Sequence, residues 1–164
     1  TSKSYIVLTL HRPSNVDSPD NLIHIINEII KNKNDKILIF PMHPRTSKVL
    51  ENIGIKFDDV FICEPLSYLE FNYLVKYSYA VITDSGGITE ETTVMNIPCL
   101  TLRDNTERPE TVAIGTNVLV GSDPTKIGHA MNQLFIGNRK ETKIPDKWDG
   151  KSGKRIVEVV LSNI

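Results

Sequence analysis

Residues 84–91 read Asp-Ser-Gly-Gly-Ile-Thr-Glu-Glu and directly follow an apolar run at 79–82. This order predicts a strand, a turn of small residues and then a helix whose first N–H groups have no partner within the helix. Glycine lets the backbone come close to a ligand, and free N–H groups at the positive end of a helix dipole favour a phosphate. Ser85, Gly86 and Gly87 are therefore a candidate phosphate cradle, although a tight turn with glycines used only for packing fits the same residues.

Two carboxylates, Glu90 and Glu91, stand one turn into the same predicted helix. Adjacent helical residues point about 100° apart, so one carboxylate can face solvent and complement the helix dipole while the other faces a ligand. A carboxylate does not bind phosphate, but it accepts hydrogen bonds from both hydroxyls of a ribose diol. The segment as a whole predicts a ligand that combines phosphate and hydroxyl groups, such as a nucleotide sugar.

The elements that position these residues can be read from the hydrophobic pattern. Short continuous apolar runs, as expected of strands buried on both faces, alternate with stretches of helical periodicity. This alternation is typical of an α/β fold, a Rossmann-like doubly wound parallel sheet, and we expect one such domain over residues 1–164. The predicted strands are 5–10, 36–40, 60–63, 80–83, 99–102 and 117–120. The predicted helices begin near residues 19, 47, 68, 88, 109, 124 and 156, and the polar stretch 137–154 is expected to be irregular.

Basic residues follow several of the predicted strands, at the edge of the sheet where such folds bind ligands. His11 follows the first strand and His43 the second, each with an arginine close behind, and residues 103–108 read Arg-Asp-Asn-Thr-Glu-Arg after the fifth. Arg108 is placed to reach a diphosphate or a sugar hydroxyl. A structural role fits each histidine as well as a catalytic or anion-binding one.

Phe71 lies on a predicted helix that starts with Ser67 and Glu70 in the spacing of a capping box. An aromatic side chain at this position suits the protein core. It suits equally a flat apolar wall against which a nucleobase can stack.

Composition excludes several classes of protein. The chain has 164 residues, of which 40% are hydrophobic and 24% charged, with a formal net charge of −1. These values predict an ordinary globular domain and give no electrostatic reason for a nucleic-acid partner. The sequence shows no membrane span or signal peptide. Cys63 and Cys99 lie too far apart for a metal or redox motif, and the histidines form no ligand pattern, so we expect reduced core thiols, no metal and a cytoplasmic protein.

Several motifs in order along the chain resemble the C-terminal half of the non-hydrolysing UDP-N-acetylglucosamine 2-epimerases. They are Thr-Leu-His-Arg at 9–12, Glu-Pro-Leu-Ser-Tyr-Leu-Glu-Phe at 64–71, the glycine turn at 83–91, and Arg-Asp-Asn-Thr-Glu-Arg-Pro-Glu at 103–110. The resemblance covers nearly the whole chain, and the combination is far more specific than a lone Ser-Gly-Gly.

The resemblance implies two Rossmann-like domains of glycosyltransferase-B-like architecture with the active site in the cleft between them. Members interconvert UDP-N-acetylglucosamine and UDP-N-acetylmannosamine by elimination of UDP to a 2-acetamidoglucal and re-addition to the other face of C2, without a cofactor or metal. The family's catalytic acids lie in an N-terminal domain that this chain does not resemble. The implied partners are therefore UDP or UDP-N-acetylglucosamine, the protein's own N-terminal domain and a second copy in a homodimer. The implied process is polysaccharide biosynthesis.

By resemblance, Ser85, Gly86 and Gly87 would hold the diphosphate of the ligand. Glu91 would bind the ribose hydroxyls, and Arg108 would contact the substrate.

The same resemblance gives roles to five further residues. Phe71 would wall the uracil, and the backbone near Leu66 would read the edge of that base. His11 matches the catalytic histidine and would act at the leaving phosphate. Arg12 and His43 match residues of a second, regulatory UDP-N-acetylglucosamine site. The sequence departs from some members at Leu66 and just after His43.

Three other functions share these motifs. A glycosyltransferase of the same architecture would pass the sugar to an acceptor, and a hydrolysing epimerase would release free N-acetylmannosamine. A non-catalytic nucleotide-sugar-binding module would need only the half present here. The chain begins at Thr1 rather than at a methionine, so we expect a processed or excised domain whose partner domain carries the rest of the chemistry.

Overall fold

The structure is a computed structural model that describes residues 3–53, 57, 59–121, 123–137 and 141–163. Within these residues one parallel sheet of six strands has the order β3-β2-β1-β4-β5-β6. This is the strand order of the dinucleotide-binding Rossmann fold, and it confirms the predicted doubly wound α/β class. The strands are β1 (Tyr5–Thr9), β2 (Ile37–Pro41), β3 (Val60–Cys63), β4 (Ala80–Thr83), β5 (Cys99–Thr101) and β6 (Asn117–Leu119).

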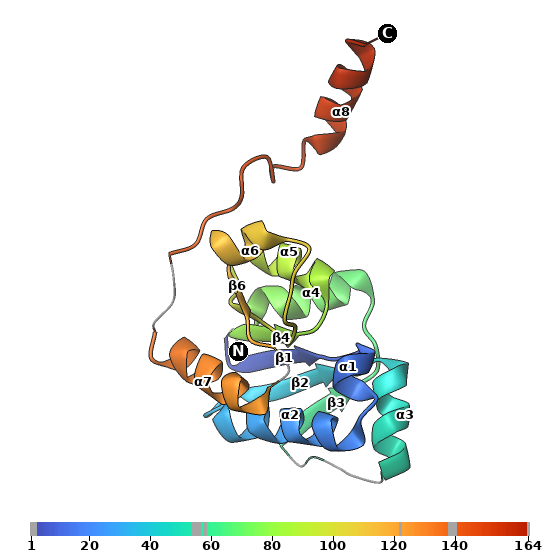
Figure 1. Ribbon diagram of the computed structural model, residues 1–164, viewed down its shortest axis with the longest axis vertical. Coiled ribbons are helices and arrows are strands. Elements are labelled where there is room, and N and C mark those ends of the chain that lie inside the picture. The colour runs from blue at the N-terminus through green and yellow to red at the C-terminus, as the bar shows by residue number, and fades with distance from the viewer. Residues whose placement is uncertain (1–2, 54–56, 58, 122, 138–140, 164) are drawn as a thin grey trace.

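Helices cover both faces of the sheet (Figure 1). One face carries α1, α2, α3 and α7, and the other carries α4, α5 and α6. The bounds are α1 (Pro13–Val16), α2 (Pro19–Asn32), α3 (Pro44–Ile53), α4 (Tyr68–Tyr77), α5 (Gly86–Val94), α6 (Pro109–Ala113), α7 (Pro124–Phe135) and α8 (Ser152–Leu161).

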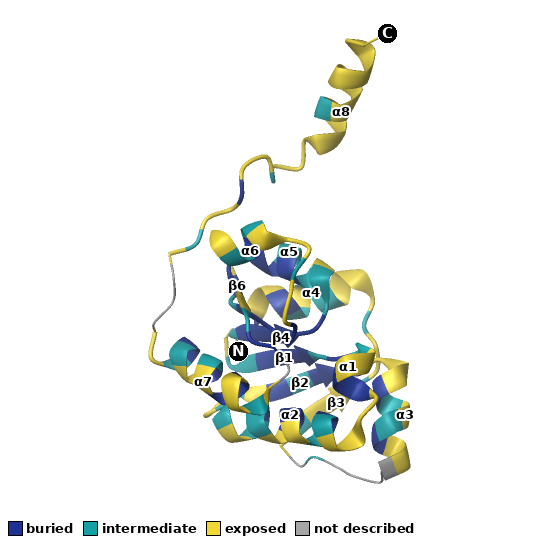
Figure 2. Cartoon of the chain, in the orientation of Figure 1, coloured by how far each residue is buried: buried dark blue, intermediate teal, exposed yellow. Residues whose placement is uncertain are grey.

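The central strands are buried on both faces, which explains their continuous apolar sequences. Ile6, Val7 and Leu8 of β1 are at most 1% exposed, and every residue of β4 is buried. The larger core cluster lies between the sheet and the apolar faces of α2 and α7, and a smaller one lies on the other side around Val7 and Val81. Figure 2 shows the buried residues concentrated in the strands and on the inner sides of these helices.

The order of the strands reverses between β1 and β4, which lie next to each other in the sheet. Thr9 and Thr83 end these two strands in register, and their hydroxyl oxygens lie 2.8 Å apart. Neighbouring chain segments leave toward opposite faces at such a point and open a crevice between them. The loops that follow β1 and β4 therefore border the place where a ligand is expected.

The predicted elements are confirmed with changes at their ends. The capping box at Ser67 is present, with its N–H donating to Glu70 Oε2 at 2.9 Å. The helix expected near residue 47 starts at Pro44 instead, because proline is favoured at a first helical position. The single turn α1 was not predicted, since four residues carry too little periodicity. Cys99 is a buried free thiol as expected, but Cys63 is only half-buried on edge strand β3.

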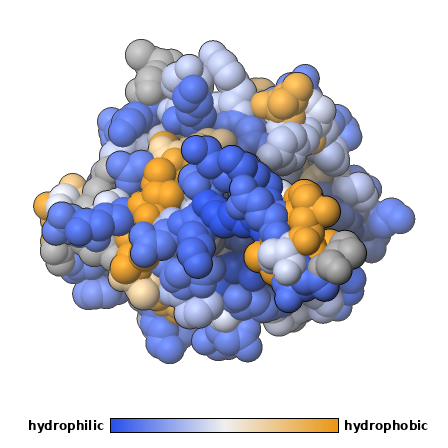
Figure 3. All heavy atoms as spheres, turned by 90° about the horizontal axis from the view of Figure 1, so that it is seen from above, coloured by the Kyte–Doolittle hydropathy of each residue, from blue (hydrophilic) through white to orange (hydrophobic). Residues whose placement is uncertain are grey.

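The C-terminal helix α8 extends away from the sheet (Figures 1 and 2). None of its described residues is buried, and Ile156 and Leu161 are 63% and 68% exposed. The described residues between α7 and α8 form no helix or strand, as the polar sequence predicted. Figure 3 looks onto this end of the molecule and shows apolar side chains at the surface among hydrophilic ones. Within the described part of the chain, no helix is both long and apolar enough to cross a membrane.

Candidate functional site

A pocket of about 370 Å³ opens at the carboxyl ends of the strands, beside the reversal of strand order. We call it the switch-point pocket. Its walls come from the ends of β1 and β2, the segment between β3 and α4, and the first turns of α4 and α5. Seven of the residues predicted from the sequence line it: His11, His43, Leu66, Phe71, Ser85, Gly87 and Glu91.

The glycine turn gives the pocket an open helix N-terminus. Ser85 is the N-cap of α5, and its hydroxyl makes no capping hydrogen bond to a described group. A Cβ atom at Gly86 would lie 3.3 Å from Nη1 of Arg103, a tight contact, so packing favours glycine at this position. A Cβ at Gly87 would meet no described atom within 4 Å, so packing does not explain the second glycine. A ligand that approaches the backbone would explain it.

His11 is held at the edge of the pocket by the carboxylate of Asp84. His11 Nδ1 lies 2.8 Å from Asp84 Oδ1, and Asp84 is fully buried. The hydrogen bond to Asp84 raises the pKa of His11, against the opposing effects of burial and of Arg12. Burial acts to raise the pKa of Asp84, but hydrogen bonds from His11, Arg12 and Asn15 outweigh it and hold that pKa below its usual value.

The adjacent carboxylates of α5 have different surroundings, as the helical geometry predicted. Glu91 lines the switch-point pocket, and burial raises its pKa although hydrogen bonds from Tyr68 and Asn72 oppose the shift. Glu90 lies beyond the pocket and accepts a hydrogen bond from Nε of Arg108. The carboxylate of Glu91 is therefore the one available to a ligand in the pocket.

The structure does not bring Arg12 and Arg108 into the pocket wall. Nε of Arg12 donates to the backbone oxygen of Asp84 at 3.0 Å. Arg108 is exposed and paired with Glu90. In the same loop, Arg103 forms two hydrogen bonds to the carboxylate of Glu107, at 2.7 and 2.9 Å, and holds the pKa of that carboxyl at about 2. Arg103 therefore stabilises the conformation of its own loop.

Phe71 takes part in both the core and the pocket wall. It is half-buried, packs against the smaller core cluster and also forms part of the pocket wall. His43 is exposed at the rim, with its ring centroid 5.9 Å from that of His11. Arg45, which follows His43 by two residues, pairs with Asp17 at 2.8 Å.

Asp84, Asn15 and Tyr68 belong to the site although none was singled out from the sequence. One feature of the sequence indicates a role for Asp84 in the site, because an acidic residue directly after a buried strand falls on the ligand edge of the sheet. No such feature indicates Asn15, since it lies on the unpredicted turn α1 and reaches Asp84 across 69 positions of sequence.

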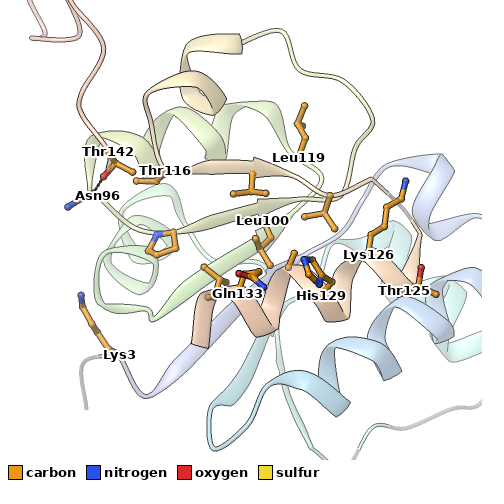
Figure 4. A pocket seen from close by; sticks show the side chains of 15 residues that line it. Lys3, Asn96, Leu100, Thr116, Leu119, Thr125, Lys126, His129, Gln133 and Thr142 are labelled. Atoms are coloured by element: carbon orange, nitrogen blue, oxygen red, sulfur yellow. Dashed lines mark hydrogen bonds between the residues drawn. The ribbon is translucent and has the colours of Figure 1, made fainter. Parts of the chain in front are cut away.

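A larger cavity of about 660 Å³ lies elsewhere, between α7 and strands β5 and β6. Lys126, His129 and Gln133 of α7 are among the side chains around it (Figure 4). It includes none of the residues predicted from the sequence to bind a ligand. Seven of the residues predicted to bind the ligand or to act on it line the smaller switch-point pocket instead.

A family model described as UDP-N-acetylglucosamine 2-epimerase matches residues 1–161 of the chain. The chain belongs to this family. It is 43% identical to the UDP-N-acetylglucosamine 2-epimerase of Methanococcus maripaludis over 98% of its own length and 45% of that enzyme's. The chain thus spans about half the length of the epimerases it matches.

Solved structures give the same relationship. The Methanocaldococcus jannaschii UDP-GlcNAc 2-epimerase in complex with UDP-GlcNAc and UDP aligns with a TM-score of 0.85 and 42% identity, over 98% of this chain and 46% of that one. An E. coli heptosyltransferase with ADP aligns at 14% identity with a TM-score of 0.57, over 84% of this chain and 45% of that one. The second match concerns the fold alone, and it agrees with half of a glycosyltransferase-B-like architecture.

Proposed function

We propose that this chain is the nucleotide-binding half of an epimerase that interconverts UDP-N-acetylglucosamine and UDP-N-acetylmannosamine. The observation that carries the proposal is the switch-point pocket, which joins an open helix N-terminus, a pocket-facing carboxylate and an aspartate-bound histidine in a member of this family. The proposed second half is the protein's own N-terminal domain, and the intact protein is proposed to be a cytoplasmic homodimer that serves polysaccharide biosynthesis.

The nucleotide would lie along the pocket from the base to the phosphates. Phe71 and Leu66 are apolar residues of its wall and would hold the uracil, with the backbone near Leu66 reading the edge of the base. Glu91 would accept hydrogen bonds from the ribose hydroxyls. The backbone N–H groups at Ser85 and Gly87, together with Gly86 between them, would hold the diphosphate.

Catalysis would begin when the bond between the sugar and UDP breaks and the sugar loses its C2 proton. The products are UDP and a 2-acetamidoglucal, and addition of UDP with a proton delivered to the other face completes the inversion. His11 would act at the departing phosphate, where a protonated imidazole offsets the developing negative charge. The acids and bases that handle the C2 proton would come from the N-terminal domain.

Three further residues would have roles beside those of the nucleotide-binding and catalytic groups. They are Arg108, Arg12 and His43. Arg108 is held beside the pocket by Glu90 and would contact the sugar part of the substrate after leaving this partner. Arg12 and His43 would contribute to the regulatory UDP-N-acetylglucosamine site, for which the exposed ring of His43 at the rim is the supporting observation.

The proposal is tested with this chain and with the intact protein in parallel. We expect calorimetry to detect UDP binding to the 164-residue chain, and we expect no turnover of UDP-N-acetylglucosamine by the chain alone. The intact protein should yield UDP-N-acetylmannosamine and a trace of the glucal. Free N-acetylmannosamine plus UDP would instead identify a hydrolysing epimerase, and turnover only with an added acceptor would identify a glycosyltransferase. Absence of UDP binding to the chain would overturn the proposal.

A further inference from the structure

Asp84 occupies the centre of the switch-point region, directly after β4, and its carboxylate is surrounded by hydrogen-bond donors. Oδ2 accepts from the backbone N–H of Arg12 at 2.9 Å and from Nδ2 of Asn15 at 3.1 Å. The backbone N–H of His11 donates to both oxygens, at 3.1 and 3.2 Å. The remaining contact joins Oδ1 to Nδ1 of His11 at 2.8 Å.

These contacts determine which nitrogen of His11 carries a proton. An ionised carboxylate only accepts hydrogen bonds, so Nδ1 of His11 must be the donor. The donors on Oδ2 keep the carboxylate from rotating, and the burial of Asp84 removes competing solvent. With the proton on Nδ1, the neutral ring has its lone pair on Nε2. His11 is 40% exposed and lines the pocket, so this nitrogen is the one that a ligand can reach.

We propose that Asp84 is a positioning residue, which fixes the orientation and tautomer of His11 so that Nε2 faces the ligand in the switch-point pocket. This inference deepens the proposed function and rests on it for the identity of the ligand. A histidine whose orientation and tautomer are set by a buried carboxylate is ready for proton transfer without first reorganising.

The other charged groups near His11 do not replace Asp84 in this role. Arg12 lies beside His11 and acts against its protonation. His43 is the neighbouring ring, and Glu91 lies in the wall of the same pocket. Asp84 is the group hydrogen-bonded to the ring of His11 among the described residues.

A purely structural role for Asp84 would need only some of these contacts. The backbone N–H groups of His11 and Arg12, with the amide of Asn15, are enough to attach the start of α1 to the end of β4. That attachment does not require the contact with the ring of His11. A test must therefore observe the ring itself.

The experiment is NMR of the 164-residue chain with 15N-labelled histidine, across the titration of His11. In the unaltered chain we expect Nδ1 to resonate as a protonated nitrogen and Nε2 as an unprotonated one once the ring is neutral. In Asp84→Asn we expect this fixed tautomer to be lost and the pKa of His11 to fall, since the negative partner is gone. Asp17→Asn is the matched control, because it makes the same substitution at an aspartate that pairs with Arg45 and not with His11, and its His11 signals should match the unaltered chain.

Each possible result either supports or contradicts the positioning role of Asp84. If folded Asp84→Asn keeps the tautomer and the titration of His11, the inference is wrong. If Asp84→Asn does not fold, the unaltered chain decides alone, because a ring protonated on Nε2 would contradict the inference and a ring protonated on Nδ1 would support it. UDP is absent from these measurements, so a failure of the proposed function would show in the binding experiment and leave this result unchanged.

Discussion

Glu90 and Glu91 show how strongly the role of a residue depends on the direction of its side chain. Both carry the same charge on the same helix turn, yet Glu91 lines the switch-point pocket and Glu90 holds Arg108 outside it. Their adjacency makes them a matched pair, because removal of either changes the net charge of the chain equally.

We predict that Glu91→Ala weakens UDP binding more than Glu90→Ala. Loss of a charged acceptor for the ribose hydroxyls should raise Kd roughly tenfold or more, since a hydrogen bond to a charged group contributes about 1.5–3 kcal/mol. Glu90→Ala should stay within a few-fold of the unaltered chain. Isothermal titration calorimetry with UDP measures both, and equal losses would contradict the different roles of the two carboxylates.

The His11–Asp84 pair also makes a prediction for stability against pH. The pKa of His11 is raised in the folded chain, so the folded state binds the proton more tightly than the unfolded state. The resulting stabilisation is complete below the unfolded pKa of about 6.5 and is lost as the pH rises through the folded pKa. Urea unfolding between about pH 6 and pH 8 should show this loss in the unaltered chain and less of it in His11→Gln. His129→Gln removes a histidine outside the pair and should behave as the unaltered chain; the same profile in both variants would rule out the pair as the cause.

At the scale of elements, α5 is a helix whose first turn leaves open space beside Gly87. Gly87 is the second residue of this helix and has open space where a side chain would stand. Glycine there gains nothing for the folded protein, because alanine is the better helix former.

We therefore predict opposite effects of Gly87→Ala on stability and on binding. The free energy of unfolding should rise by about 0.5 kcal/mol because alanine restricts the unfolded chain and favours the helix. UDP binding should weaken about tenfold, because the new methyl group occupies the path of the diphosphate to the backbone. Gly86→Ala is the contrast, since its methyl group would crowd Arg103 and should lower stability instead. Tighter UDP binding by Gly87→Ala would refute the phosphate cradle.

The elements and the site differ in how far the sequence predicts them. Every strand and the long helices were recognisable, because hydrophobic periodicity is a local property of the chain. The positions of Ser85 and Gly87 beside the pocket followed from the strand-turn-helix pattern, whereas the choice of Glu91 over Glu90 came from the family resemblance. The contact between Asp84 and His11 spans 73 positions, and the order of the strands that creates it is absent from any local pattern. The exposed pairing of Arg108 with Glu90 depends on the path of a loop, which sequence rules describe poorly.

At the scale of the whole molecule, the sheet domain and α8 contribute very differently to stability. The core lies in the clusters on the two faces of the sheet, and none of the described residues of α8 is buried. Folding of the sheet domain therefore does not depend on the C-terminal helix.

We predict that deletion of residues 152–164 changes the free energy of unfolding by less than about 1 kcal/mol, within the range of surface changes. Leu22→Ala, at a fully buried position of α2, should cost about 2–5 kcal/mol and shows the sensitivity of the assay. Urea unfolding followed by circular dichroism measures both variants. A loss of several kcal/mol on deletion would mean that α8 packs against the domain in solution.

The exposed apolar side of α8 has a consequence for the fate of the chain in a cell. Ile156, Val159, Val160 and Leu161 are all more than half exposed, as in a protein whose folding is unfinished. Chaperones bind such surfaces, and proteases cut at irregular exposed segments such as the one that precedes α8. A partner that covers this helix is therefore expected to lengthen the lifetime of the protein without changing the sheet domain.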